Sequence, residues 1–325
     1  MNLKTQMEKV IIGSFSNTAG IVVRKNDQTV YENYYNGYTA GNTVHITSVT
    51  KSIVSALMGI AIDQGYIESI DEKILTYFPD YKIPREETSI QKITIKDMMT
   101  MTAPYKCKTE PYVKAFESEH LVEFALDLLG GKGKIGEFRY SPMIGIHVLS
   151  GILMRAIGQS ILDFATENLF SPLEIVVKEN VELHNKEENL SFLKDRNISG
   201  WVVDADGVNM AGWGLTLTPT DMAKIGQLYL DKGIWNGRQI IPSAWIVEST
   251  REHSRCKEWK LSYGYLWWII DAKEGVYAAM GDGGNTIYVN EKKHLIIAIA
   301  CSYLQGTKDR LKLIRDYIEP VFETM

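Results

Sequence analysis

The sequence has 325 residues and a mass of 36.8 kDa, which predicts one elaborate domain or two interlocked ones around a sizeable core. With 45% hydrophobic and 23% charged residues, the composition is typical of a globular protein and excludes a disordered, fibrous or membrane chain. The 35 basic and 40 acidic residues give a net charge of -5, so we do not expect nucleic acid as a partner. The longest apolar stretch, Ile53 to Ile62, is about half the length that spans a bilayer, so we do not expect a membrane either.

The N-terminal segment and the cysteines both bear on where the protein works. The first apolar run, Val10 to Ile12, is far shorter than the seven or so residues that a signal peptide needs. Cys107, Cys256 and Cys301 form no C-x-x-C pair, so neither a disulfide framework nor a zinc site is predicted. We therefore expect a cytoplasmic protein with no bound metal.

The predicted elements change from strands to helices and back along the chain. Runs at 20–24 and 29–35 predict a β-hairpin, and apolar residues at helical spacing from Val49 predict a buried helix that ends at Gly65. Further elements are predicted as helices at 94–101, 120–129, 145–157 and 161–169, strands at 266–270, 276–280, 286–289 and 295–301, and a last helix at 308–322.

This order predicts an α/β (α+β) fold with a central antiparallel β-sheet flanked by helices and an inserted all-helical region. We expect residues 1–67 and 196–325 to form the α/β sheet domain and residues 68–195 the helical domain. The active site is expected at the boundary between the two.

Ser48-Val49-Thr50-Lys51 is an S-x-x-K motif at the start of the predicted buried helix. A spacing of three residues places both side chains on one helix face, where the lysine amine reaches the serine hydroxyl. Chance predicts about 1.5 such motifs in a chain with 19 serines and 25 lysines, and four occur, so position decides among them. The motifs at Ser89, Ser191 and Ser254 lie in polar or charged stretches, whereas Ser48 opens an apolar helix.

The plainer interpretation of this motif is a helix cap followed by a solvated lysine. If Lys51 is a base, its pKa must fall by about three units from the ordinary value near 10.4, which costs about 4 kcal/mol and requires burial. Tyr140, in a predicted loop before a helix, is a candidate second proton carrier, although most tyrosines only fill cores or surfaces. A glycine-rich turn, Gly281 to Asn285, either offers a backbone N–H to an oxyanion or is an ordinary hairpin turn.

Other chemistries lack support in the sequence. There is no G-x-S-x-G nucleophile elbow, and the six histidines form no H-E-x-x-H or H-x-H motif. The G-x-G-x-x-G match at 131–136 follows a helix-like segment and not a strand, so we read it as a loop. Trp213, Trp267 and Trp268 fit an aromatic core better than a substrate cleft.

The order of these motifs resembles the class C β-lactamase-like serine hydrolases, which include penicillin-binding proteins, DD-peptidases, esterases and amide hydrolases. The similar segments cover about residues 20–305 and include Lys92–Thr102, Phe138–Leu173, Gly212–Ile241, Tyr263–Trp268 and Gly281–Val289.

The resemblance implies a role for each motif and a β-lactamase/transpeptidase-like fold. Ser48 is the implied acylated nucleophile, Lys51 its proton acceptor, and Tyr140 the group that relays protons to the leaving group and from water. The oxyanion hole would be formed by the backbone N–H groups of Ser48 and Asn285, or of Gly284 if the register moves by one residue. No cofactor is implied.

Two departures from the family pattern affect the expected substrate. Pro142 stands where the family commonly has the asparagine of Y-x-N, and Asp282 of Asp282-Gly283-Gly284 stands where it has lysine or histidine. An anion at position 282 neither attracts a carboxylate nor lowers the pKa of Tyr140. We therefore hypothesise that β-lactams are poor substrates and that neutral or cationic esters or amides are preferred.

Three functions remain open at this stage. The first is hydrolysis of a small ester or amide, the second is β-lactamase or DD-peptidase activity on a β-lactam-like substrate, and the third is a non-catalytic homologue that only binds a ligand. The absence of a leader peptide in this sequence argues against cell-wall work. The oligomeric state is not predicted.

Overall fold

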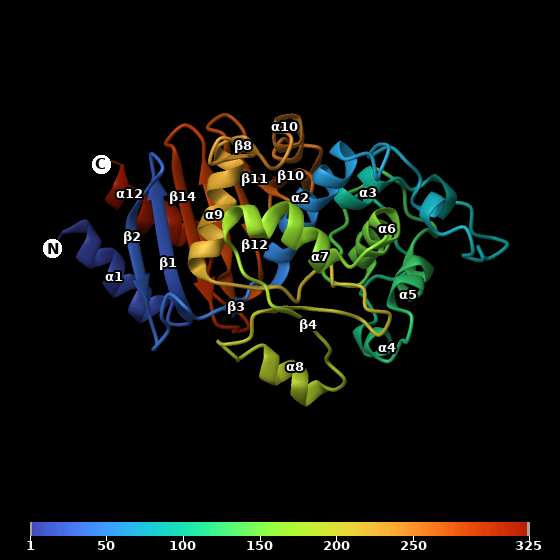
Figure 1. Cartoon of the computed structure of the whole chain (residues 1–325), viewed down its shortest axis with the longest axis horizontal. Coiled ribbons are helices and arrows are strands. Elements are labelled where there is room, and N and C mark those ends of the chain that lie inside the picture. The colour runs from blue at the N-terminus through green and yellow to red at the C-terminus, as the bar shows by residue number, and fades with distance from the viewer. Residues whose placement is uncertain (1, 324–325) are drawn as a thin grey trace.

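Strands from the two ends of the chain meet in one sheet in the computed structural model, which describes residues 2–323. Within these residues, the sheet has eight antiparallel strands in the order β2-β1-β14-β13-β12-β11-β10-β9. β1 pairs with β14, with Ile21 opposite Ile299, so the N-terminal hairpin lies beside the C-terminal strands (Figure 1). The strands are β1 Thr18–Lys25, β2 Gln28–Tyr34, β9 Ser254–Cys256, β10 Leu261–Tyr263, β11 Trp268–Asp271, β12 Val276–Met280, β13 Thr286–Asn290 and β14 Leu295–Cys301.

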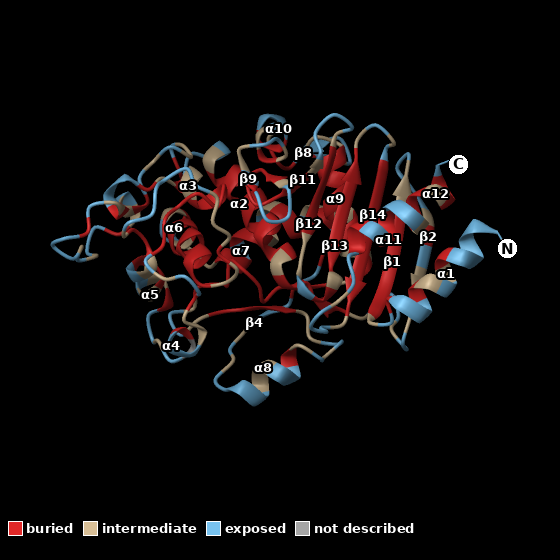
Figure 2. Cartoon of the chain, turned by 180° about the vertical axis from the view of Figure 1, so that it is seen from behind, coloured by how far each residue is buried: buried red, intermediate tan, exposed pale blue. Residues whose placement is uncertain are grey.

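Helices cover both faces of this sheet, which explains why β14 is a continuous apolar run. Successive side chains of a strand point to opposite faces, and in β14 both sets are buried. One face packs on α2 (Thr50–Asp63) and α9 (Pro219–Leu230), and the other on α1 (Leu3–Ser14), α11 (Arg310–Leu313) and α12 (Glu319–Phe322). Figure 2 shows the buried central strands behind α11, with the outer face of α1 exposed.

The helices α3 to α6 gather at the end of the molecule away from the termini, whereas α7 lies near the middle and α8 below it (Figure 1). α6 packs against both α2 and α5. The helices are α3 Ile95–Met99, α4 Tyr112–Phe116, α5 Leu121–Leu128, α6 Val148–Ile157, α7 Ile161–Ala165 and α8 Lys186–Phe192, with α10 Ser243–Ser249 later in the chain. The remaining strands are short pairs, namely β3 Val44–His45 with β6 Thr216–Leu217, β4 Glu179–Val181 with β5 Gly200–Val202, and β7 Ile234–Trp235 with β8 Arg238–Gln239.

The predicted fold class is confirmed, and the main differences concern short or irregular elements. β4 lies in a stretch for which only helices were predicted, because its three residues are mostly exposed and carry no apolar alternation. The charged segment around Ser254 forms the edge strand β9, in which Cys256 is buried. The predicted last helix is divided by a π-helical turn at Ile314–Ile318, and another π-helical turn follows α7. The boundaries proposed at residues 67 and 195 stay predictions.

Within residues 2–323, no individual helix has the length and apolar character needed to cross a bilayer. Only the bent pair Gly145–Ile157 and Ile161–Leu173, with 78° between its halves, meets that test when its members are combined.

Candidate active site

Ser48 lies on a strained turn that leads directly into α2. The turn, Thr47–Val49, is a single 3₁₀ segment. Thr47 has a φ of 51°, a left-handed conformation that a β-branched residue rarely adopts. Its hydroxyl lies 2.8 Å from the Ile46 carbonyl oxygen and 3.0 Å from that of Asp282, and Thr50 Oγ1 donates to the Thr47 carbonyl at 2.7 Å. These contacts hold the strained conformation, which is a feature that clusters at functional sites.

Lys51 is buried one helical turn later and points at Ser48. Its Nζ lies 2.8 Å from Ser48 Oγ, 2.7 Å from the Pro142 carbonyl oxygen and 3.0 Å from the Gly212 carbonyl oxygen. Burial lowers the pKa of Lys51 to about 7, although the carboxylates of Glu110 and Asp282 oppose this shift. The amine therefore exchanges its proton near neutral pH.

Tyr140 lies beside both Ser48 and Lys51. Its hydroxyl interacts with the Ser48 side chain, and Lys51 Nζ lies 5.3 Å from the centre of its ring. Burial raises the pKa of Tyr140, the interaction with Ser48 lowers it, and the charge of Asp282 raises it further. Tyr140 is therefore a neutral phenol at ordinary pH, with a proton to donate.

The segment after Tyr140 is fixed by Glu110, a residue that the sequence did not single out. The buried carboxylate accepts hydrogen bonds from Ser141 Oγ at 2.5 Å and from the backbone N–H groups of residues 143, 144 and 145 at 2.9–3.1 Å. The same segment carries the Pro142 carbonyl that accepts from Lys51. Glu110 thus orients the loop that holds the lysine, a role that its sequence context does not signal.

The glycine-rich turn packs directly on the Ser48 turn. A Cβ atom at Gly281 would lie 2.1 Å from Thr47 Oγ1 and 3.0 Å from Ser48 N, so only glycine fits at this approach. The Gly284 N–H donates to the Gly281 carbonyl at 3.1 Å and is therefore already engaged within the turn. The Asn285 amide side chain is buried and donates to the His45 carbonyl at 3.2 Å.

The remaining members of the predicted turn differ in exposure. Gly283 is buried with a φ of 80°, whereas the Asp282 carboxylate is exposed at the edge of the site. The choice between Gly284 and Asn285 as oxyanion donor stays a prediction, and the engaged Gly284 N–H favours Asn285.

His45 is a buried residue that holds a neighbouring backbone segment of the site, a role that the sequence did not predict. Burial lowers the pKa of His45 to about 3, so its ring is neutral, and Nε2 accepts a hydrogen bond from the Gly214 N–H at 2.8 Å. This contact anchors the segment whose Gly212 carbonyl accepts from Lys51. His45 acts on Lys51 only indirectly, through the segment 212–214, so the spacing of the S-x-x-K motif does not reveal its role.

A cleft of about 930 Å³ opens beside Tyr140. Its walls come from the segments 105–112, 136–142 and 255–259 and from Trp268. Trp268 was predicted to lie in the core; it is 3% exposed but also borders this cleft, whereas Trp267 is fully buried.

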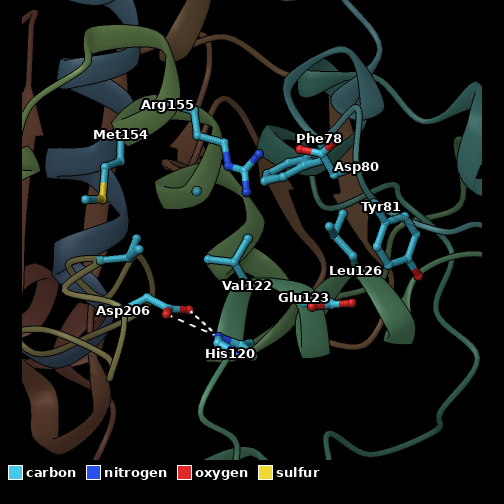
Figure 3. Close-up of a pocket in the computed structure, with 12 residues that line it drawn as sticks. Phe78, Asp80, Tyr81, His120, Val122, Glu123, Leu126, Met154, Arg155 and Asp206 are labelled. Atoms are coloured by element: carbon cyan, nitrogen blue, oxygen red, sulfur yellow. Dashed lines mark hydrogen bonds and ion pairs between the residues drawn. The ribbon is translucent and has the colours of Figure 1, made fainter.

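Another cavity, of about 500 Å³, lies among α5, α6 and the loop after β5 (Figure 3). Figure 3 shows Arg155 and Phe78 across this cavity from the pair His120–Asp206. Its ionic side chains are exposed, so solvent screens their charges. Of Ser48, Lys51 and Tyr140, only Tyr140 is among the described lining residues of the cleft of about 930 Å³, and none of the three is among those of this second cavity, so we place the candidate site beside that cleft. Among residues 2–323, no three His, Cys, Asp or Glu side chains cluster as metal ligands.

The sheet with its helical neighbour, and a serine–lysine pair at the start of a buried helix, define the class of β-lactamase-fold proteins. The chain belongs to the Beta-lactamase family, whose model matches residues 13–319. It is 20% identical to the 6-aminohexanoate-dimer hydrolase of Paenarthrobacter ureafaciens over 308 residues, which cover 88% of this chain and 73% of that protein.

Two solved structures show the same fold. The octameric penicillin-binding protein homologue from Pyrococcus abyssi has a TM-score of 0.73 at 18% identity, covering 98% of this chain and 78% of that one. A family VIII carboxylesterase has a TM-score of 0.70 at 14% identity, covering 98% of both chains. The family and its relatives point to a hydrolase of this fold.

Proposed function

We propose that the protein is a serine hydrolase that cleaves a small ester or amide through an acyl-enzyme on Ser48. The observation that carries this proposal is the buried Lys51 amine, 2.8 Å from Ser48 Oγ and with a pKa lowered to about 7. A lysine amine that is free near neutral pH is a competent base for a serine hydroxyl.

The two carbonyl partners of Lys51 determine where its lone pair points. The oxygens of Pro142 and Gly212 only accept hydrogen bonds, so they retain the two N–H groups of the neutral amine. The lone pair then faces Ser48 Oγ, whose hydroxyl becomes the donor. In the acylation step, Lys51 takes this proton while Ser48 Oγ bonds to the substrate carbonyl carbon.

Tyr140, whose hydroxyl interacts with Ser48, completes the reaction. When the tetrahedral intermediate collapses, the bond to the leaving alcohol or amine breaks and Tyr140 delivers a proton to it. Lys51 returns its proton to the Tyr140 oxygen, so the two groups regain their starting states. In deacylation, the same pair removes a proton from water as it attacks the acyl carbon, and Ser48 Oγ leaves with that proton.

The oxyanion would be stabilised by the N–H groups of Ser48 and Asn285. Support for this assignment comes from the close packing of the Gly281 turn on the Ser48 turn, which brings both segments to the same place. Displacing the Gly281 turn by the substitution Gly281→Ala should lower the rate of acylation if this turn supplies an oxyanion donor.

An ester or amide fits the site better than a β-lactam or a peptide with a free carboxylate. Asp282 is an anion where the family pattern has a cation, and its charge repels a substrate carboxylate. The names of the relatives point the same way, since one is a dimer hydrolase and one a carboxylesterase. β-Lactamase or DD-peptidase activity is the second candidate, because a penicillin-binding protein homologue shares the fold.

Labelling of the nucleophile tests the mechanism. A fluorophosphonate probe should add to Ser48, as mapped by mass spectrometry, and Ser48→Ala should show no adduct and no turnover. Parallel assays with p-nitrophenyl acetate and nitrocefin separate the first two candidates, and nitrocefin turnover far above ester turnover would reverse their order. Absence of any adduct, with Ser48→Ala equal to the parent, would indicate the non-catalytic binding protein.

A further inference from the structure

An exposed tryptophan occupies the turn between β9 and β10, at the mouth of the cleft beside Tyr140. Trp259 is 54% exposed, although its chain neighbours, Glu258 and Lys260, are charged. Cys256 pairs with Leu261 at the base of this hairpin, so the turn is held by the edge of the main sheet. Large exposed aromatic rings are enriched at binding surfaces because they offer contact area at a low entropic cost.

The Trp259 ring continues an aromatic surface that runs to the catalytic centre. Its centre lies 5.0 Å from that of Trp268 and 6.2 Å from that of Tyr140, and the Tyr140 and Trp268 centres are 5.7 Å apart. Phe138 packs on Trp268 at 6.2 Å and also lines the cleft. One wall of the cleft is therefore aromatic from its mouth to the hydroxyl that meets Ser48.

The charged side chains of the cleft do not select an ion. Both signs occur together in solvent among the exposed charges that line the cleft, which are Lys108 and Glu137 and, near Trp259, Arg255, Lys257 and Glu258. The Arg139 guanidinium already donates to the Tyr105 carbonyl at 2.7 Å, and the Glu110 carboxylate is occupied by the loop after Tyr140. Recognition in this cleft is left to the aromatic faces.

We propose that this aromatic wall binds the leaving-group side of the substrate, and that Trp259 selects alcohols or amines that carry an aromatic or other bulky apolar group. The inference rests on the proposed function, in which Tyr140 protonates the leaving group. The part of the substrate beyond the protonated atom must then lie on the Tyr140 side of Ser48, where the cleft opens. The acyl group lies on the other side of the scissile bond, away from Trp259.

Two ester series distinguish the two sides of the substrate. One series keeps the butyryl group and changes the alcohol from methanol to benzyl alcohol; the other keeps methanol and changes the acid from acetic to phenylacetic acid. For Trp259→Ala we expect kcat/KM to fall about tenfold for benzyl butyrate and less than about twofold for methyl butyrate and methyl phenylacetate. Trp259→Phe should recover most of the loss, because it keeps an aromatic face.

The rate of deacylation separates a specific effect on the leaving group from a general structural defect, because a general defect would also change this rate. Benzyl and methyl butyrate give the same butyryl-enzyme, so its hydrolysis should be equal in the parent and in Trp259→Ala. Tyr66→Ala, which removes a 45% exposed tyrosine outside the cleft, is the matched control and should leave all ratios unchanged. A loss that follows the acid series, or equal losses for both alcohols, overturns the assignment.

Failure of the proposed function would be visible separately, as a parent protein that forms no acyl-enzyme. Titration with benzyl alcohol still decides the binding claim in that case. The alcohol should quench tryptophan emission in the parent and much less in Trp259→Phe. Equal quenching in the two proteins overturns the binding role of Trp259.

Discussion

Replacement of Glu110 by glutamine removes one charge and keeps the shape of the side chain. In the parent, Oε1 accepts from Ser141 Oγ and the Gly145 N–H, and Oε2 accepts from the N–H groups of Met143 and Ile144. The glutamine NH₂ group must replace either Oε1 or Oε2. At both positions the surrounding groups are hydrogen-bond donors, so the NH₂ group meets donors where the carboxylate oxygen accepted from them. The less costly orientation puts nitrogen at Oε1, since the Ser141 hydroxyl can turn to accept from it.

The cost of Glu110→Gln can be worked out from this arrangement. The Gly145 N–H loses its acceptor, and a buried unpaired donor costs about 1–3 kcal/mol. The three remaining hydrogen bonds change from charged to neutral partners, at about 1 kcal/mol each or somewhat less. We expect a loss of about 4 kcal/mol in the free energy of unfolding. For 325 residues, at about 2.1 cal/mol/K per residue, this lowers Tm by about 6 °C.

The same substitution should change the pH dependence of catalysis. The Glu110 charge raises the pKa of Lys51, so its removal moves the acid limb of kcat/KM to lower pH. Calorimetry and an ester assay across the pH range measure both effects. Glu137→Gln is the control, because this carboxylate lines the same cleft but is exposed, and it should change Tm by less than about 1 °C. An unchanged Tm for Glu110→Gln, or a shift of the limb to higher pH, refutes the reasoning.

Three further predictions concern the base, the glycine turn and a buried hydrogen bond between His147 and Asp204. Because the pKa of Lys51 is lowered to about 7, its amine is free above that pH, and kcat/KM should rise as the pH passes through about 7. Lys51→Arg, whose side chain stays protonated, should lower kcat by about 10²–10⁴. A rate like that of the parent would exclude Lys51 as the base. Gly281→Ala forces a Cβ atom to 2.1 Å from a hydroxyl of the nucleophile turn and should cost about 1–3 kcal/mol together with most of the acylation rate, whereas Gly41→Ala, with nothing within 4 Å, should change neither. Asp204 lies 2.9 Å from His147 with both side chains buried, so Asp204→Asn should lower the free energy of unfolding by about 1–3 kcal/mol in guanidinium titrations. An unchanged midpoint would show that this hydrogen bond contributes nothing.

The sequence by itself determined the elements whose side chains repeat with a clear period. The helix after Ser48 and the strands at 276–280 and 295–301 are recognisable because apolar spacing reports how many faces are buried. The proximity of Ser48 and Lys51 also follows from local geometry, because residues three apart share a helix face. Their catalytic roles, like the domain boundaries, remain predictions.

Only the tertiary structure decided what surrounds that pair. The carbonyl oxygens of Pro142 and Gly212 aim the amine, and a carbonyl carries no signal in the sequence, because every residue has one. Glu110 and Trp259 reach the site from segments far along the chain, and the residues between them and Ser48 set no period that would bring them together. Burial of the lysine, which lowers its pKa, likewise results from packing between distant segments and not from the four-residue motif.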